Sequence, residues 1–186
     1  MTTKTILAMS LAAVFAVSMI SAAYAVPRAS YLDITGVSTG ATSTVTLDGD
    51  VKQIPANKAL DTITFWAFPV EESFGGGSLN VAAVTIHHGA NDHQYVGSID
   101  NDPSPVNQNV RSTPVQSFHP HYANFDGLGC LVGLESPKID FKVSGNTITL
   151  DTSGVTPLGF AASGTIGVRS ECTATGLGIT SLDDFQ

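Results

Sequence analysis

The sequence is poor in methionine and cysteine, and both shortages limit the metal chemistry it can carry. The three methionines all lie within the first nineteen residues, and histidine follows neither of the two cysteines. A blue-copper site needs a cysteine, a histidine close behind it and an axial methionine. The sequence therefore excludes that class of copper protein.

Basic side chains are also scarce. Eight lysines and arginines stand against sixteen aspartates and glutamates, which gives a formal net charge of −8. Such an acidic surface repels phosphate backbones and anionic lipids. We therefore expect no nucleic-acid partner and, once an export signal has been cleaved, no direct membrane insertion. Metal ions, or a protein partner outside the cell or in the cell envelope, fit this charge better.

The longest apolar run lies at the N-terminus and is typical of an export signal. Lys4 precedes an apolar stretch over residues 6–20, and Ala23-Tyr24-Ala25 places small residues where a signal peptidase reads them. The stretch is shorter than the about 20 residues that span a membrane. We expect residues 1–25 to be a secretory signal peptide, residues 26–186 to form one domain, and the protein to be secreted or held in the cell envelope.

The two cysteines, Cys130 and Cys172, are expected to form a disulfide, because an exported chain meets oxidising conditions. The bond would close a loop of about 40 residues and contribute roughly 3–4 kcal/mol to stability. Two free thiols, or one cysteine acting as a metal ligand, remain as alternatives.

Helical periodicity is absent beyond the export signal, because no segment there sustains an apolar stripe every 3.6 residues. Short stretches rich in valine, isoleucine, threonine and aromatics instead predict strands between turn residues. These strands are expected at residues 31–37, 43–47, 61–68, 79–88, 138–143, 146–151 and 164–171. Each needs a second sheet to bury its apolar face. The predicted fold is all-β: a single antiparallel β-sandwich, immunoglobulin-like or jelly-roll-like, of roughly seven to ten strands.

The clearest unit is a hairpin over residues 138–151. Ile139, Phe141 and Val143 alternate with charged residues, and a turn containing Gly145 leads into a second alternating run. The apolar positions are expected to face the core. Trp66, which lies between two phenylalanines, is expected to be a core aromatic.

All five histidines fall within residues 87–121, and two of them form a His-x-His pair. In an extended segment His119 and His121 point to the same side, because strands have a period of two. Neutral imidazoles are good ligands for copper and zinc. We predict that this pair, with His87 or His93 as a third ligand, holds one such ion. The carboxylates expected in or around that site are Asp92, Asp100, Asp102 and Asp126.

One further comparison with a known family narrows the metal hypothesis without assigning a family. The expected combination of one disulfide, a β-sandwich and a strand carrying a His-x-His pair resembles that of the copper–zinc superoxide dismutases. In that family, however, the pair precedes the remaining ligands, whereas here it comes last, so no residue role is carried over. Histidines on the surface without any ligand remain the alternative to a metal site.

Catalytic signatures are missing. The sequence has no Gly-x-Ser-x-Gly elbow, no phosphate-binding glycine loop and no His-Glu-x-x-His motif. An enzyme is therefore less favoured than two other functions. One is a secreted module that binds copper or zinc through its histidines. The other is a structural or adhesive domain of the extracellular space or cell envelope, with neither metal nor catalysis.

Overall fold

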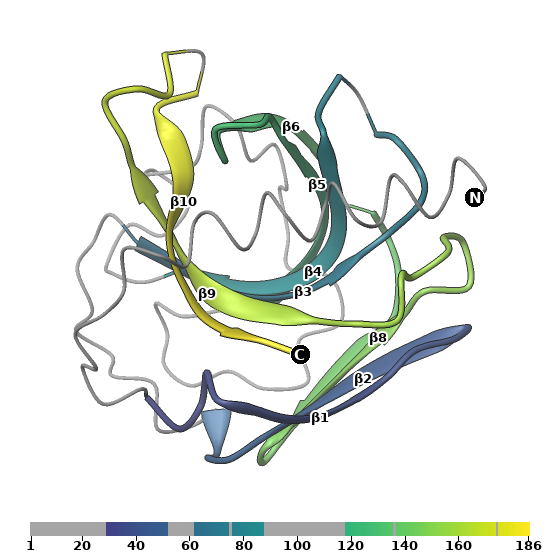
Figure 1. Ribbon diagram of the computed structural model, residues 1–186. Coiled ribbons are helices and arrows are strands. Elements are labelled where there is room, and N and C mark those ends of the chain that lie inside the picture. Colours follow the sequence, from purple (N-terminus) through teal and green to yellow (C-terminus); the bar gives the residue numbers. More distant parts are fainter. Residues whose placement is uncertain (1–28, 52–61, 75, 88–117, 136, 174) are drawn as a thin grey trace, which may run out of the picture.

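The computed structural model describes residues 29–51, 62–74, 76–87, 118–135, 137–173 and 175–186, except for the side chains of Thr62 and His87. The expected signal peptide lies outside these residues. The fold is all-β: two antiparallel sheets pack together, and one of them is strongly curled (Figure 1). This confirms the predicted sandwich. Within the described ranges, no helix is long and apolar enough to cross a membrane.

The smaller sheet has four strands in the order β1-β2-β8-β7. Its strands are β1 (Ile34–Ser38), β2 (Thr42–Leu47), β7 (Phe141–Ser144) and β8 (Thr147–Asp151). The predicted hairpin joins β7 to β8 through Gly145, whose φ of 59° suits glycine. Phe141 and Val143 are buried while Lys142 is exposed, so the predicted register is confirmed.

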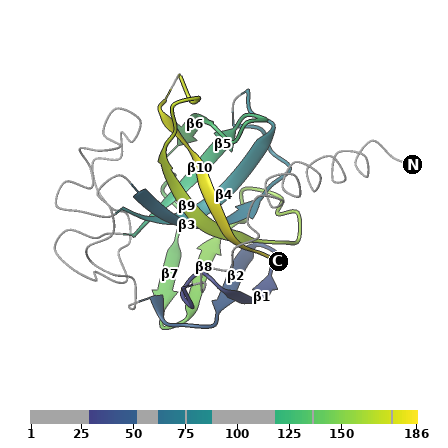
Figure 2. The same cartoon turned by 60° about the vertical axis from the view of Figure 1, so that its left-hand side comes forward.

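The larger sheet has six strands in the order β10-β9-β3-β4-β5-β6. The strands are β3 (Thr62–Pro69), β4 (Leu79–His87), β5 (Phe118–Phe125), β6 (Leu131–Glu135), β9 (Ala162–Val168) and β10 (Leu177–Phe185). Figure 2 shows the small sheet below the convex side of this large one.

The central strands of the larger sheet are apolar on both faces, so this sheet borders two cores. On β3, Trp66 and Phe68 pack in the core shared with the four-stranded sheet. Phe65 and Ala67, which alternate with them, belong to a second core inside the curl. Strands buried on both faces read as continuous apolar runs. The sequence of β3 is such a run.

The curl of the large sheet has a local cause in β10. The pairing of β10 with β9 shifts register between Ile179 and Ser181 and again between Leu182 and Asp184. Bulges of this kind bend a strand and increase its twist. Gly164 pairs with Leu182, between the two register shifts, and a Cβ atom there would overlap the carbonyl oxygen of Ser181. Glycine is therefore required for the close approach of the two strands.

The edge strands β6 and β10 meet where the curled sheet nearly closes on itself. Cys130 forms an isolated bridge with Gly178, and the N–H of Ile179 donates to the carbonyl of Gly129 at 2.9 Å. Next to this contact Cys130 and Cys172 form the predicted disulfide, with a Cα–Cα distance of 5.3 Å. The bond thus fastens one edge of the sheet to the hairpin that forms the other edge.

The chain before β1 is tied to the large sheet by side-chain hydrogen bonds. The indole N–H of Trp66 donates to the carbonyl oxygen of Tyr31 at 3.0 Å. The hydroxyl of Ser163 donates to the carbonyl oxygen of Leu32. Trp66 is fully buried, which confirms its predicted place in the core.

Candidate functional site: an apolar cavity inside the curled sheet

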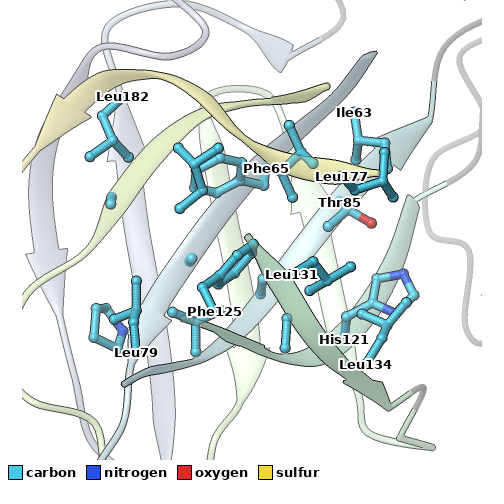
Figure 3. Close-up of a pocket in the computed structure, with 18 residues that line it drawn as sticks. Ile63, Phe65, Leu79, Thr85, His121, Phe125, Leu131, Leu134, Leu177 and Leu182 are labelled. Carbon is cyan, nitrogen blue, oxygen red and sulfur yellow. The ribbon is translucent and has the colours of Figure 1, made fainter. Parts of the chain in front are cut away.

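The concave side of the large sheet encloses an apolar cavity (Figure 3). Its lining side chains come from all six strands of that sheet. The volume is about 50 Å³, counted as the space open to the centre of a water-sized sphere. At roughly 10–15 Å³ for each water by this measure, the space would admit about four water molecules.

Small side chains create this space. Ala67 on β3 pairs with Ala83 on β4 and with Ala162 on β9, so three alanines lie side by side across neighbouring strands. All three line the cavity. Methyl groups cannot reach across the interior of the curl, whereas Phe65 and Phe125 fill the space on either side. The cavity therefore follows from alanine at three paired positions.

The rim of the cavity lies on the two edge strands. Leu134 on β6 and Ile179 and Leu182 on β10 are half-buried, in contrast to the buried residues on the central strands. An apolar molecule entering the cavity would meet these three side chains first.

Among the lining residues that the structure describes, two are polar, Thr85 and His121. Thr85 is 6% exposed, and its hydroxyl has no hydrogen-bond partner among the described residues. Figure 3 shows both residues at one end of the cavity, with Leu79 and Leu182 at the other. The cavity thus has an apolar body and a polar end.

The predicted histidine pair lies beside this polar end. His119 and His121 are 0% and 3% exposed, and their ring centroids are 6.0 Å apart. In the ladder between β4 and β5, His119 is opposite Thr85 and His121 is opposite Ala83. These two histidines are therefore buried, and the surface alternative is wrong for them.

Of the other residues predicted for the metal site, the structure describes the side chain of Asp126. The side chain of His87 lies outside the described residues, as do His93, Asp92, Asp100 and Asp102. Asp126 is described, and its Oδ1 accepts the N–H groups of Leu128 and Cys130, both at 2.9 Å. This aspartate closes the turn between β5 and β6.

No group of three or more histidine, cysteine, aspartate or glutamate side chains is placed to hold a metal ion in the part of the chain that the structure describes. Both cysteines are in the disulfide, which excludes a cysteine ligand. The metal site stays a prediction, and the histidine pair is the part of it that the structure brings together.

Sequence reasoning missed the cavity and Thr85. A signal was present in β4, where Leu79, Val81, Ala83 and Thr85 share one face and only the last is polar. Whether such a threonine finds a partner depends on neighbouring strands, and the sequence does not contain that information.

No protein-family model, no curated protein and no solved structure matches this chain. The disulfide indicates an oxidising compartment of the extracellular type. Beyond that, the cavity and the histidine pair are the features from which a function can be inferred.

Proposed function

We propose that this domain binds a small lipophilic molecule in the cavity of the curled sheet. The observation that carries the proposal is the cavity itself, which is apolar, enclosed by six strands and bordered by half-buried leucine and isoleucine side chains. Ligand sites are typically concave and apolar with a few polar groups that orient the ligand. Burial of apolar surface would provide the free energy, at about 25 cal/mol for each Å².

The volume limits which part of a ligand can enter. Space for about four waters suits a short alkyl chain or a single ring. The rest of a longer molecule would contact Leu134, Ile179 and Leu182 at the rim. An apolar cavity of this kind excludes water readily, so an entering hydrocarbon group displaces little bound solvent.

The test is titration of the disulfide-intact protein with 1-hexanol and toluene, followed by calorimetry and ligand-observed NMR. We expect saturable binding. Ala83→Leu should weaken it at least about tenfold, because the new side chain fills the cavity. Absence of saturable binding by the parent, or equal binding by the variant, would contradict the proposal.

Ala82→Leu is the matched control, because Ala82 precedes Ala83 on β4 but packs in the core between the sheets. Leucine there overpacks a filled core and should cost about 1–3 kcal/mol of stability. The cavity in that variant is unchanged, so ligand binding should persist wherever the variant is folded. Ala83→Leu, which fills empty space, should not lose stability in the same way.

A second candidate function is the binding of copper or zinc, and the geometry of His119 and His121 favours it. Two imidazole nitrogens about 2.0–2.1 Å from one zinc ion, at a tetrahedral angle, place their ring centroids about 5 Å apart. The observed separation is 6.0 Å between rings on the same side of β5, so the rings would approach by about 1 Å to share one ion. His87 or His93 would supply the third ligand, as the sequence predicts.

Calorimetry with Zn²⁺ and Cu²⁺ tests this second candidate. Ligating histidines must be neutral, so affinity should fall steeply below a pH of about 6.5. The double variant His119→Ala, His121→Ala should lose binding. If the parent shows no pH-dependent binding, the metal function is wrong. If it also binds no lipophile, the structural or adhesive role in the extracellular space or envelope is the function that remains.

A further inference from the structure

We propose that the cavity selects an uncharged lipophile that carries a hydroxyl or carbonyl oxygen, which lies beside Thr85 and His121. This inference rests on the proposed function, because it names the chemical class of the ligand for the same cavity. It is carried by Thr85, a buried hydroxyl without a partner among the described residues that lines an apolar space.

Thr85 lies in the interior of the large sheet, which explains why its hydroxyl lacks a partner. In the ladders it is paired with Phe65 on β3 and with His119 on β5. Backbone groups on both sides are thus engaged between strands. A buried polar group left without a hydrogen bond is costly, and the cost is removed when a partner arrives. A ligand oxygen at the polar end of the cavity would be that partner.

The position of His121 strengthens this assignment. Its imidazole lines the same end of the cavity as the Thr85 hydroxyl (Figure 3). An alcohol both donates and accepts hydrogen bonds, and a ketone accepts them, so either group matches a hydroxyl beside an imidazole. A plain hydrocarbon would leave the hydroxyl of Thr85 without a partner.

A carboxylate fits this end poorly. The described lining contains neither lysine nor arginine, and the chain carries a formal net charge of −8. Burying an anion in an apolar site without a countercharge is strongly unfavourable. The cavity should therefore reject fatty acids in their ionised form while it accepts the alcohol or ketone of equal length.

The experiment compares four six-carbon ligands at pH 7.5: 1-hexanol, 2-hexanone, n-hexane and hexanoate. We expect the alcohol and the ketone to bind about tenfold more tightly than hexane, and hexanoate at least about tenfold more weakly than hexanol. Thr85→Val removes the hydroxyl while keeping a similar shape. It should weaken hexanol binding about tenfold and leave hexane binding unchanged.

Thr152→Val is the matched control. Thr152 is also buried, but its hydroxyl donates to the carbonyl of Gly40 at 2.7 Å and lies 2.8 Å from the hydroxyl of Ser43. That variant should keep the ligand order and lose thermal stability. Thr85→Val should keep or gain thermal stability, because it removes a polar atom that lacks a partner.

The outcomes separate the two proposals. If none of the four ligands binds the parent, the proposed function itself fails. If hexane and hexanoate bind as tightly as hexanol, the cavity binds lipophiles without the selectivity inferred here, and this inference alone fails. If Thr85→Val keeps the full preference for hexanol over hexane, Thr85 is not the selecting group.

Discussion

At the scale of single residues, Glu72 shows how one partly exposed carboxylate holds two loops together. Its Oε2 accepts the N–H of Thr156 and its Oε1 accepts the hydroxyl of the same residue, both at 2.7 Å. Slight burial raises the pKa of Glu72, but the hydrogen bonds from Thr156 outweigh it and hold the pKa below its ordinary value of 4.5. The contact joins the loop after β3 to the connection between β8 and β9.

A pH-dependent loss of stability follows for Glu72→Gln. Because the folded pKa is lowered, the ionised carboxylate stabilises the fold above pH 4.5, and this contribution is lost as the pH falls through the folded pKa. At pH 7 the variant should lose a few tenths to about 1 kcal/mol, because hydrogen bonds to a charged group are weakened where solvent screens them. In strong acid the two proteins should have equal free energies of unfolding by urea.

Glu135→Gln serves as the control for that measurement, because Glu135 is exposed and its carboxylate hydrogen-bonds no described residue. It removes the same charge and should change stability little at either pH. An equal loss for Glu72→Gln at pH 7 and in acid would show that the contact with Thr156 does not depend on ionisation.

The spacing of residues along one strand predicts part of the site, but contacts between strands distant in sequence are not predicted. The spacing of His119 and His121 predicts that they share a side of one strand, and both rings are found buried beside the cavity. Their burial, and the lack of a partner for Thr85, depend on strands that are distant in sequence. The cavity likewise depends on the pairing of Ala67, Ala83 and Ala162, which only the folded sheet creates.

At the scale of elements, the alternation of apolar and polar residues predicts the regular strands but not the irregular ones. The seven expected strands correspond to β1 to β4 and β7 to β9, and the hairpin β7–β8 has the predicted faces. The strands β6 and β10 were not predicted, and β5 was expected only as an extended segment around His119 and His121. β6 contains Gly133, and the bulges of β10 break its period of two, so neither shows a clean alternation.

The sequence of β5 argues against a full strand because it contains Pro120, which cannot donate to a ladder. The structure shows how this proline is tolerated. β6 pairs with β5 from Tyr122 to Phe125, so Pro120 lies where β5 has β4 on one side and no β6 residue on the other. At this position β5 is an edge strand, where proline is allowed.

At the scale of the whole molecule, two cores and one closure define the fold. The predicted sandwich accounts for the core between the sheets, which contains Trp66 and Phe141. It does not account for the second core, because a flat sheet would expose Phe65 and Leu131 to water. Curling the sheet buries them. The curl needs bulges and a glycine contact in β9 and β10, and no periodicity rule predicts these.

The closure places the disulfide next to the cavity lining, so under the proposed function it bears on binding as well as on stability. Cys130 lies at the start of β6, next to Leu131 in the cavity lining, and Cys172 lies in the β9–β10 connection before Leu177. Three hydrogen bonds accompany the disulfide at this junction. They join Ile179 to Gly129, the Arg169 guanidinium to Leu128 at 3.0 Å, and the Thr175 hydroxyl to the carbonyl of Leu131 at 2.8 Å.

Removal of the disulfide should therefore weaken the molecule without abolishing the fold. For the double variant Cys130→Ala, Cys172→Ala, the chain-entropy relation predicts a loss of about 4 kcal/mol for a cross-link between residues separated by 42 positions. The three hydrogen bonds still join the edges, so the variant should unfold cooperatively at a lower urea concentration. Its affinity for 1-hexanol should also fall, because the edge strands that carry Leu134 and Ile179 are held less firmly.

Unchanged stability would show that the hydrogen bonds alone hold the edges. Unchanged affinity together with lower stability would show that the covalent bond stabilises the fold without shaping the cavity.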